Sequence, residues 1–271
     1  MISGEGTERI AEAFARARAD GRRAALMPYL MGGYPDLEAS RAIGLAYAEA
    51  GADLVELGIP FSDPLADGTV IHAAATVALN AGATLPALLE VCSAIAEHVP
   101  VIVMCYSNPI LARGLERFLD ELVAAGVSGL IVPDLPLEEA ADARAGCGQR
   151  RLAFVPLVAP TTPADRMAQI GGGASGFLYA VSVTGTTGER TDAEATPQAM
   201  IARAAAHTKV PVALGFGIGT PEQAAAAAAA GADGVIVGSR LVRAAGEAEN
   251  PAEAVAELIR GFSAALSEPL V

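Results

Sequence analysis

The sequence has no tryptophan, few aromatic residues of any kind (4 %) and only three cysteines, Cys92, Cys105 and Cys147. The cysteines lie far apart, unlike the close pairs of a zinc knuckle or the dense pattern of a secreted disulfide scaffold, so we expect reduced, structural thiols. Lysine and arginine total 18 against 31 Asp and Glu, a net charge of −13. This shortage of positive charge argues against a nucleic-acid groove but leaves room for a small phosphorylated ligand.

Long hydrophobic runs are also missing. The mainly apolar stretch 99–112 contains Ser107, Asn108 and Pro109 and is too short to span a bilayer. The first twenty residues mix charged and apolar positions, unlike the uninterrupted apolar middle of a secretory signal. With 52 % hydrophobic residues among 271, the composition instead predicts a soluble protein with a large core. We therefore expect a cytoplasmic protein that does not enter membranes.

An internal repeat organises the chain: a glycine that ends a helix is followed almost at once by a compact apolar run. The repeat units begin at Gly51, Gly126, Gly173 and Gly231. Four further runs of strand character lie at 25–31, 99–106, 152–158 and 210–216. The eight runs are almost continuously apolar rather than alternating, as expected of parallel strands that are covered on both faces.

The segments between these runs predict helices. Apolar residues recur at helical spacing in 115–123 and 255–262, and the alanine run 224–230 also favours a helix. Thr162 and Thr220 each precede a proline and an acidic or amide side chain, a pattern typical of a helix start. Eight strands alternating with helices predict α/β architecture: a single (β/α)8 TIM barrel over residues 1–271, with an additional N-terminal helix over roughly 8–19. An open doubly wound sheet is the alternative, although no G-x-G-x-x-G follows the first strand.

The chemistry of such a barrel lies at the end where its strands finish. Lys209, the one lysine in the chain, precedes a predicted strand, as do His98 and His207, which places all three at the opposite end. This placement argues against a Schiff-base lysine and against a zinc-binding histidine cluster, since His72 alone lies near the active end. We therefore predict no metal site, and carboxylates remain to transfer protons.

Two acidic residues stand out. Glu56 lies within an apolar strand, where burial is expected to raise its pKa toward the range of a general acid–base. The alternative is that Glu56 has a structural role, paired with an arginine or a backbone amide. The following loop, 58–68, brings Asp63 and Asp67 toward the same end, although Asp beside Pro or Gly is also a common turn former.

Glycine loops follow the seventh and eighth predicted strands, where this fold binds phosphate at the N-terminus of a short helix. They contain Gly217 and Gly238, the latter followed by Ser239, which has a hydroxyl to offer an anion. The alternative is that these glycines only turn the chain. The polar loop 184–191 has the composition of a lid that closes over a substrate, but a surface loop with no functional role would have the same composition.

Further polar residues stand near strand ends. Tyr106, Asp134 and Tyr179 follow or end the third, fourth and sixth predicted strands. Their alternative role is packing inside the barrel.

Several stretches of the sequence together resemble the α chain of tryptophan synthase. They are 54–68, 132–136, 187–188, 215–218 and 238–239, and they occur in the family's order along nearly the whole chain. The first, LVELGIPFSDPLADG, is highly specific, whereas glycine loops occur in many phosphate-binding barrels. The resemblance implies a lyase that cleaves indole-3-glycerol phosphate to indole and glyceraldehyde 3-phosphate by a retro-aldol step.

The resemblance also implies roles for individual residues. Glu56 is similar to the family's principal acid–base, and Asp67 to the carboxylate that interacts with the indole N–H. Thr187 matches a lid threonine that orders Asp67. With the residues at strand ends, the predicted substrate-binding set is Tyr179, Thr187, Tyr106 and Asp134. The predicted phosphate-binding set is Gly188, Gly217, Gly238 and Ser239.

A partner is implied as well: the pyridoxal-phosphate-dependent β chain, in an α2β2 heterotetramer, to which indole passes directly. The chain itself is then expected to need no cofactor. Loops 61–69 and 184–192 are hypothesised to close together over substrate. The sequence departs from the family pattern at Thr69, His72 and Gly219, and Thr69 permits more open states of the Asp67 loop than the usual proline would.

Three other functions use the same features. A free-standing lyase would release indole without a β chain. A phosphoribosyl-type isomerase or an indole-glycerol-phosphate synthase would use a similar barrel, but the synthase relies on lysines at the active end. A non-catalytic subunit would keep the phosphate loops alone, and the presence of both Glu56 and Asp67 argues against it.

Overall fold

Nine parallel strands form one sheet in the computed structural model, which describes residues 5–181, 196–215 and 217–267. The strands are β1 (Ala25–Met31), β2 (Val55–Gly58), β3 (Val101–Met104), β4 (Gly129–Ile131), β5 (Ala153–Phe154), β6 (Leu157–Val158), β7 (Leu178–Val181), β8 (Val212–Gly215) and β9 (Gly234–Val237). They pair in the order β5-β4-β3-β2-β1-β9-β8-β7-β6. The first and last strands of the sequence are therefore neighbours.

The fifth predicted strand is divided in two, and the sheet closes at this division. Pro156 lies between β5 and β6 and has no N–H to donate. The N–H of Val155 donates to the carbonyl of Leu130 (2.9 Å), and the carbonyl of Pro156 accepts from the N–H of Tyr179 (3.0 Å). The run 152–158 thus joins β4 on one side to β7 on the other. The predicted barrel is confirmed, with a fifth strand in two pieces.

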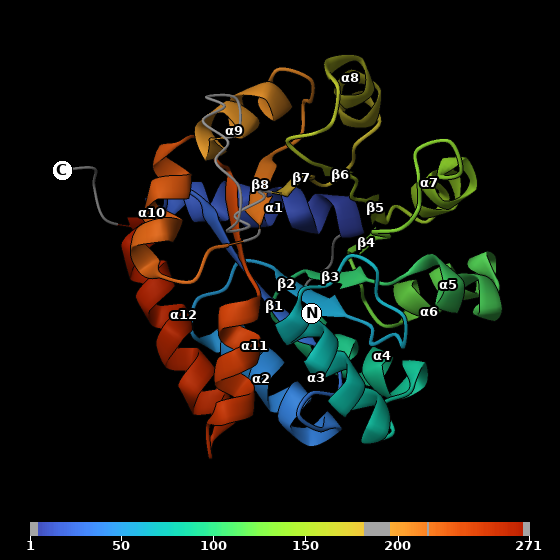
Figure 1. Cartoon of the computed structure of the whole chain (residues 1–271), viewed down its shortest axis with the longest axis vertical. Helices are drawn as coiled ribbons and strands as arrows, with labels where there is room; N and C mark the ends of the chain where they lie inside the picture. Colours follow the sequence, from blue (N-terminus) through green and yellow to red (C-terminus); the bar gives the residue numbers. More distant parts are fainter. Residues whose placement is uncertain (1–4, 182–195, 216, 268–271) are drawn as a thin grey trace.

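Helices surround the strands (Figure 1). Those that follow strands are α2 (Leu37–Glu49), α3 (Thr69–Asn80), α4 (Leu85–Ala96), α5 (Ser107–Arg113), α6 (Leu115–Ala124), α7 (Ala141–Gln149), α8 (Ala164–Gly172), α9 (Pro197–Ala205), α10 (Pro221–Ala229), α11 (Ser239–Glu247) and α12 (Pro251–Ser267). One apolar cluster lies between helices and strands and another inside the barrel, which is why the strands are apolar on both faces.

Helix length and hydropathy bear on membrane crossing. Within the described ranges, no single helix is long and apolar enough to cross a membrane; the pair α3 and α4, bent by 114°, passes that test by length and composition only.

The additional N-terminal helix, α1 (Gly6–Ala19), closes the barrel at the end where the strands begin. Ile10 and Phe14 are buried on it and pack among side chains that point into the barrel. These inward-facing side chains include Met27, Leu54, Ile102, Ile131 and Phe177. Arg9 fixes the helix in place, because its guanidinium donates to the carbonyls of Ala96 (2.5 Å) and Gly126 (3.0 Å), which precede β3 and β4. The opposite end of the barrel is left for the functional site.

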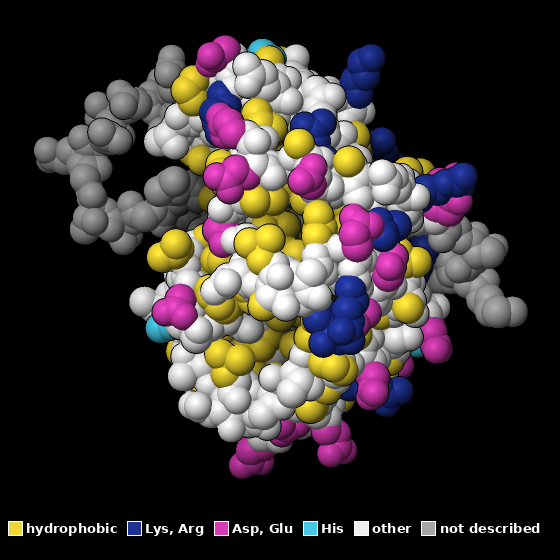
Figure 2. Space-filling view, turned by 90° about the vertical axis from the view of Figure 1, so that its right-hand side faces the viewer, with side chains coloured by type: hydrophobic (Ala, Val, Ile, Leu, Met, Phe, Trp, Pro, Cys, Tyr) yellow, Lys and Arg dark blue, Asp and Glu magenta, His cyan; other side chains and the backbone are white. Residues whose placement is uncertain are grey.

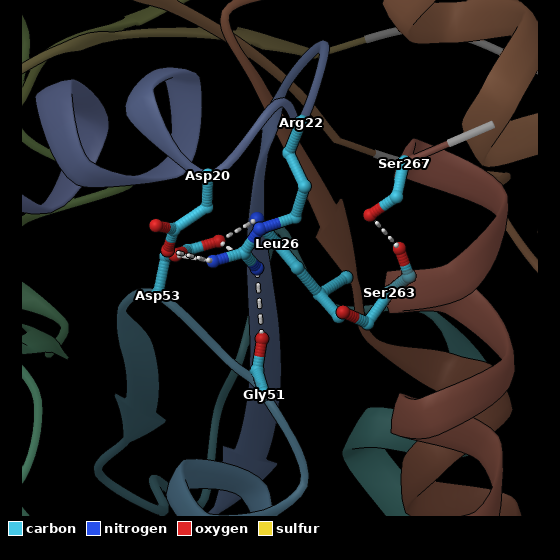
Figure 3. A network of polar contacts seen from close by, with 7 residues as sticks. All are labelled: Asp20, Arg22, Leu26, Gly51, Asp53, Ser263 and Ser267. Carbon is cyan, nitrogen blue, oxygen red and sulfur yellow. Dashed lines mark hydrogen bonds and ion pairs between the residues drawn. The ribbon is translucent and has the colours of Figure 1, made fainter. Parts of the chain in front are cut away.

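A buried ion pair joins the segments that precede β1 and β2 (Figure 3). The guanidinium of Arg22 contacts both carboxylate oxygens of Asp53, at 2.5 and 2.7 Å, and donates to the carbonyl of Gly51 (3.0 Å). Asp53 also accepts from the N–H of Leu26 (2.8 Å). Asp20 is a peripheral member, 3.8 Å from Arg22 and mostly exposed. The two-pronged contact fixes the first two strands relative to each other.

The two predicted helix starts differ in detail. Thr220 and Gln223 form a capping box at α10, each side chain bonded to the other's backbone N–H. Thr162 does not cap α8, so that part of the prediction is wrong. Its hydroxyl instead accepts from the N–H of Ala159 (2.9 Å), and Pro163 occupies the N-cap position. The side chain of Thr162 is used by the preceding turn.

The repeated glycines end helices as predicted. Gly51, Gly126 and Gly231 adopt φ values of +110°, +73° and +99°, which side chains with a Cβ rarely tolerate. Gly173 follows α8 with φ of −105° and so ends that helix without a left-handed residue.

Charged side chains of both signs are scattered, among uncharged and hydrophobic ones, over the side of the molecule that carries α5, α6 and α7 (Figure 2). Arg150 pairs with Glu116 (2.8 Å) and Asp120 (2.7 Å), which links α7 to α6. Because the acidic partners are mostly exposed, such pairs contribute at most about 1 kcal/mol each. The buried pair between Arg22 and Asp53 is therefore the stronger structural contact.

We expect Asp53→Ala to lower the free energy of unfolding by about 2–4 kcal/mol, because Arg22 keeps its buried charge without a carboxylate and the N–H of Leu26 loses its acceptor. Denaturant unfolding followed by circular dichroism measures the change. Asp20→Ala is the matched control and should change it by less than about 0.5 kcal/mol. Equal losses in the two variants would contradict the role assigned to the buried pair.

Candidate active site

The open end of the barrel contains a cavity of about 330 Å³. Its walls come from the carboxyl ends of the strands and from the segments that follow them. The predicted site residues that line it are Glu56, Asp67, Tyr179, Gly217, Gly238 and Ser239. Apolar side chains, among them Ile71, Leu157 and Ile236, form much of the remaining wall. Barrel closure thus brings together residues that are far apart in the sequence.

Glu56 is buried in β2, with 1 % of its surface exposed. The flanking side chains of Val55 and Leu57 belong to the cluster under the helices, so Glu56 faces the barrel interior. Its Oε2 atom has no hydrogen-bond partner in the described part of the chain. Burial, and secondarily the charge of Asp67, raise the pKa of Glu56 to about 8. The group holds a proton at neutral pH and releases it at small free-energy cost, as a general acid–base must.

Asp67 reaches the cavity from the loop between β2 and α3, where Tyr106 holds it. The Tyr106 hydroxyl donates to Oδ1 of Asp67 (2.9 Å) and accepts from the N–H of Ala66 (3.0 Å). Partial burial raises the pKa of Asp67, while the hydrogen bond from Tyr106 opposes that rise. The cavity therefore contains two carboxyl groups in unlike surroundings, an arrangement that separates a proton donor from a stabilising carboxylate.

Tyr29 of β1 and Tyr179 of β7 also line the cavity, and two glycines make room for their hydroxyls. A Cβ atom at Gly58 would overlap the hydroxyl of Tyr29, and one at Gly215 would overlap that of Tyr179. Burial raises the pKa of both phenols well above 10, so both stay neutral donors. Sequence reasoning misses Tyr29; strand register, which pairs it with Glu56, is what places it in the site.

The segments after β8 and β9 form the other end of the cavity. Gly217 has φ of +81°, a backbone conformation that glycine adopts readily. Gly238 precedes α11, and Ser239 is its first residue. The first N–H groups of a helix have no intrahelical acceptor and favour an anion. The predicted phosphate position therefore opens on the same cavity as Glu56 and Asp67.

Four predicted residues are not among those that line the cavity. One of them, Tyr106, acts through its hydrogen bond to Asp67. Asp134 accepts from the N–H (2.8 Å) and the hydroxyl (2.7 Å) of Ser107, so it holds the start of α5. Thr187 and Gly188 lie outside the described residues, as does the predicted lid at 184–192. Their roles stay predictions.

The basic residues considered for other chemistries lie elsewhere. Lys209 and His207 precede β8, and His98 precedes β3. His72 is exposed near the start of α3. Across the described ranges, no group of three or more His, Cys, Asp or Glu side chains is arranged to hold a metal ion.

Comparisons with curated sequences agree on one family. The family model for the tryptophan synthase alpha chain matches residues 14–267. The chain is 50 % identical over 236 residues to the tryptophan synthase alpha chain of Prochlorococcus marinus, a match that covers 86 % of each chain. It is 46 % identical over 259 residues to the alpha chain of Synechococcus elongatus, with 95 % of this chain and 96 % of that one covered.

Solved structures give the same result. The chain superposes on a chain of Mycobacterium tuberculosis tryptophan synthase with a TM-score of 0.88 and 38 % identity, covering 96 % of this chain and 99 % of that one. A chain from the tryptophan synthase α2β2 complex of Pyrococcus furiosus matches with a TM-score of 0.81 and 36 % identity, covering 88 % and 97 %.

The raised pKa of Glu56 predicts a pH-dependent stability. The folded chain binds its proton up to about pH 8, whereas the unfolded chain loses it near 4.5, so stability falls as pH rises between these values. Glu56→Gln should remove this loss, because glutamine does not titrate. At pH 8 the variant should be more stable than the unaltered chain. The difference in the free energy of unfolding should shrink by up to about 1.4 kcal/mol for each pH unit toward pH 4.5.

Urea unfolding at several pH values measures the slope. The matched control is Glu257→Gln, on the exposed side of α12, whose slope should equal that of the unaltered chain. Equal slopes for Glu56→Gln and the control would show that Glu56 is ionised in the folded chain at neutral pH.

Proposed function

The chain belongs to the tryptophan synthase alpha chain family, lyases that cleave indole-3-glycerol phosphate to indole and glyceraldehyde 3-phosphate, and we propose how its residues perform this reaction. The observation that carries the proposal is the carboxyl group of Glu56, buried in the cavity wall with one oxygen that no described residue hydrogen-bonds. Burial raises the pKa of this group to about 8, close to neutrality.

Glu56 acts as both acid and base. Cleavage moves one proton from the glycerol hydroxyl to carbon 3 of the indole ring while the bond between ring and side chain breaks. Protonated Glu56 first gives its proton to the ring carbon, which leaves a positively charged indolenine-like intermediate. As the carbon–carbon bond breaks, its electron pair restores the ring, and the hydroxyl proton passes to the Glu56 carboxylate. The enzyme regains its starting state, and a pKa of about 8 suits both transfers.

Asp67 stabilises the intermediate. The ring nitrogen carries much of the positive charge after protonation, and the Asp67 carboxylate lies in the same cavity to accept its N–H. Tyr106 orients that carboxylate through the 2.9 Å hydrogen bond. A preorganised charge in a site shielded from water stabilises a developing charge more than it would in bulk solvent. Thr187, outside the described residues, is proposed to order Asp67 as well.

Substrate binding divides between the two ends of the cavity. Apolar side chains such as Ile71 and Leu157 pack against the indole ring, and Tyr179 contacts the indole glycerol. The phosphate lies at the start of α11, held by Gly217, Gly238 and Ser239, with Gly188 from the undescribed segment. Asp134 supports the site through Ser107 and α5.

The partner of the chain is the tryptophan synthase β chain, and pyridoxal phosphate belongs to that chain. We propose that the α chain uses no cofactor of its own, since both proton transfers are assigned to side chains. We also propose that the β chain contacts Leu65 and Leu111, which are 90 % and 72 % exposed. Leu65 precedes Asp67 by two residues and Leu111 lies on α5 after Tyr106, so contact with both segments would affect the Asp67–Tyr106 hydrogen bond.

We further propose that residues 1–271 form one domain that works in the cytoplasm. Pairing of β1 with β9 supports a single domain, because strands from both ends of the chain share one sheet. The unpaired, buried thiols of Cys92, Cys105 and Cys147 suit a reducing compartment.

We expect Glu56→Gln to lower kcat for indole release by about 10²–10⁴-fold, because the shape of the side chain is kept while the transferable proton is lost. The assay uses the purified chain alone and with saturating β chain. The dissociation constant of an uncleavable substrate analogue should stay within about threefold, since the polar shape of the site is unchanged. Substantial residual turnover would remove Glu56 from the central role, and fast turnover of the unaltered chain alone would favour a free-standing lyase.

Asp67→Asn should lower kcat more than it raises KM, because the lost charge stabilises an intermediate rather than the bound substrate. Steady-state kinetics of the complex with the β chain separates the two constants. Asp142→Asn, an exposed position on α7, is the matched control and should change neither. A rise in KM with unaltered kcat would assign Asp67 to binding instead.

A further inference from the structure

Two arginines of α11 line the cavity, and neither has a place in the roles assigned above. Arg240 is the second residue of the helix and Arg243 follows one turn later, so both lie on the same side of α11. Arg240 is half-buried and Arg243 is exposed. Among the described residues that line the cavity, these are the cationic ones, and the carboxyl groups of Glu56 and Asp67 share the space with them.

The position of Arg240 is unfavourable by local rules. The N-terminus of a helix carries a partial positive charge, so a cation in the first turn is destabilising and an anion is favoured. The described residues include no ion pair or hydrogen bond from the guanidinium of Arg240 or Arg243, whereas Arg22, Arg150 and Arg166 each hold a carboxylate. A cation at such a place, facing a cavity, is stabilised when an anion from outside the chain lies between it and the helix.

The charge of the chain is a second reason to expect that these arginines bind an anion. The chain has a net charge of −13, and the Asp67 carboxylate lies in its cavity. A phosphate dianion approaching this cavity meets repulsion that neutral N–H groups and a serine hydroxyl offset only in part. Guanidinium groups bind phosphate through charge-assisted hydrogen bonds that are about twice as strong as neutral ones.

We propose that Arg240, with Arg243 behind it, binds the phosphate of the substrate and makes the site selective for a phosphorylated ligand. The inference rests on the proposed function and deepens it. Arg240 supplies a two-pronged guanidinium contact next to Gly238 and Ser239, whereas Arg243, one turn along and more exposed, attracts the dianion at longer range.

The experiment compares Arg240→Ala, Arg243→Ala and the double variant in complex with the β chain. KM for indole-3-glycerol phosphate should rise about ten- to a hundredfold in Arg240→Ala, less in Arg243→Ala, with kcat changed less than about twofold. Arg240→Lys keeps the charge but not the fork and should fall between. Arg260→Ala, an exposed arginine of α12, removes the same charge elsewhere and should leave KM unchanged.

A charged and an uncharged inhibitor together distinguish a loss of phosphate binding from a change in the shape of the cavity. The inhibition constant of glycerol 3-phosphate should rise in parallel with KM, while that of an uncharged indole alcohol should stay the same. Added salt should raise KM of the unaltered complex more steeply than that of the double variant. Weakening of both inhibitors alike would indicate a structural defect and overturn the proposal.

The arginine proposal and the lyase proposal fail in different ways. If the unaltered complex releases indole but KM is the same in all arginine variants, the arginines have no part in phosphate binding and the lyase stands. If the unaltered complex releases no indole, the lyase proposal fails. Calorimetric titration with glycerol 3-phosphate then still tests the arginines, and equal affinities across the variants would overturn their role.

Discussion

An ionisable group buried inside an apolar barrel is the constraint on which the site depends. Glu56 has neighbours on β2 that pack under the helices. It lines the cavity, and its Oε2 has no hydrogen-bond partner among the described residues. Removing a carboxylate from water without compensation is costly, so the proton stays on at neutral pH. The same burial that destabilises the fold at this point gives the group its chemistry, and the rest of the barrel must offset it.

The two ends of the barrel have different roles: one supports the fold and the other carries the site. Where the strands begin, α1 fills the barrel, Arg9 holds the ends of two helices, and Arg22 pairs with Asp53. Where they end, Glu56 lines the cavity and Asp67 is held there by Tyr106. The end that α1 closes therefore supports the fold, and the open end carries the groups that face a substrate.

The sequence predicts the strands and the burial of Glu56, because burial on both faces leaves an apolar run that a single acid interrupts. Tyr29 escapes this reasoning, since its place beside Glu56 depends on strand register rather than on any local pattern. Thr162 fails as a cap because a turn three residues earlier takes its hydroxyl, a competition invisible in the helix-start pattern. Arg240 also escapes this reasoning, because its relation to the cavity depends on how α11 lies against the barrel.

Because the fifth strand is divided, the hydrogen bonding between strands is not the same all around the barrel. Elsewhere each strand bonds to both neighbours, but β5 bonds only to β4 and β6 only to β7, with Pro156 between them. The barrel therefore closes through one short stretch of chain that passes from the β4 side to the β7 side at Pro156. Leu157, which lines the cavity, directly follows this proline, so the residues that close the ring also form part of the cavity wall.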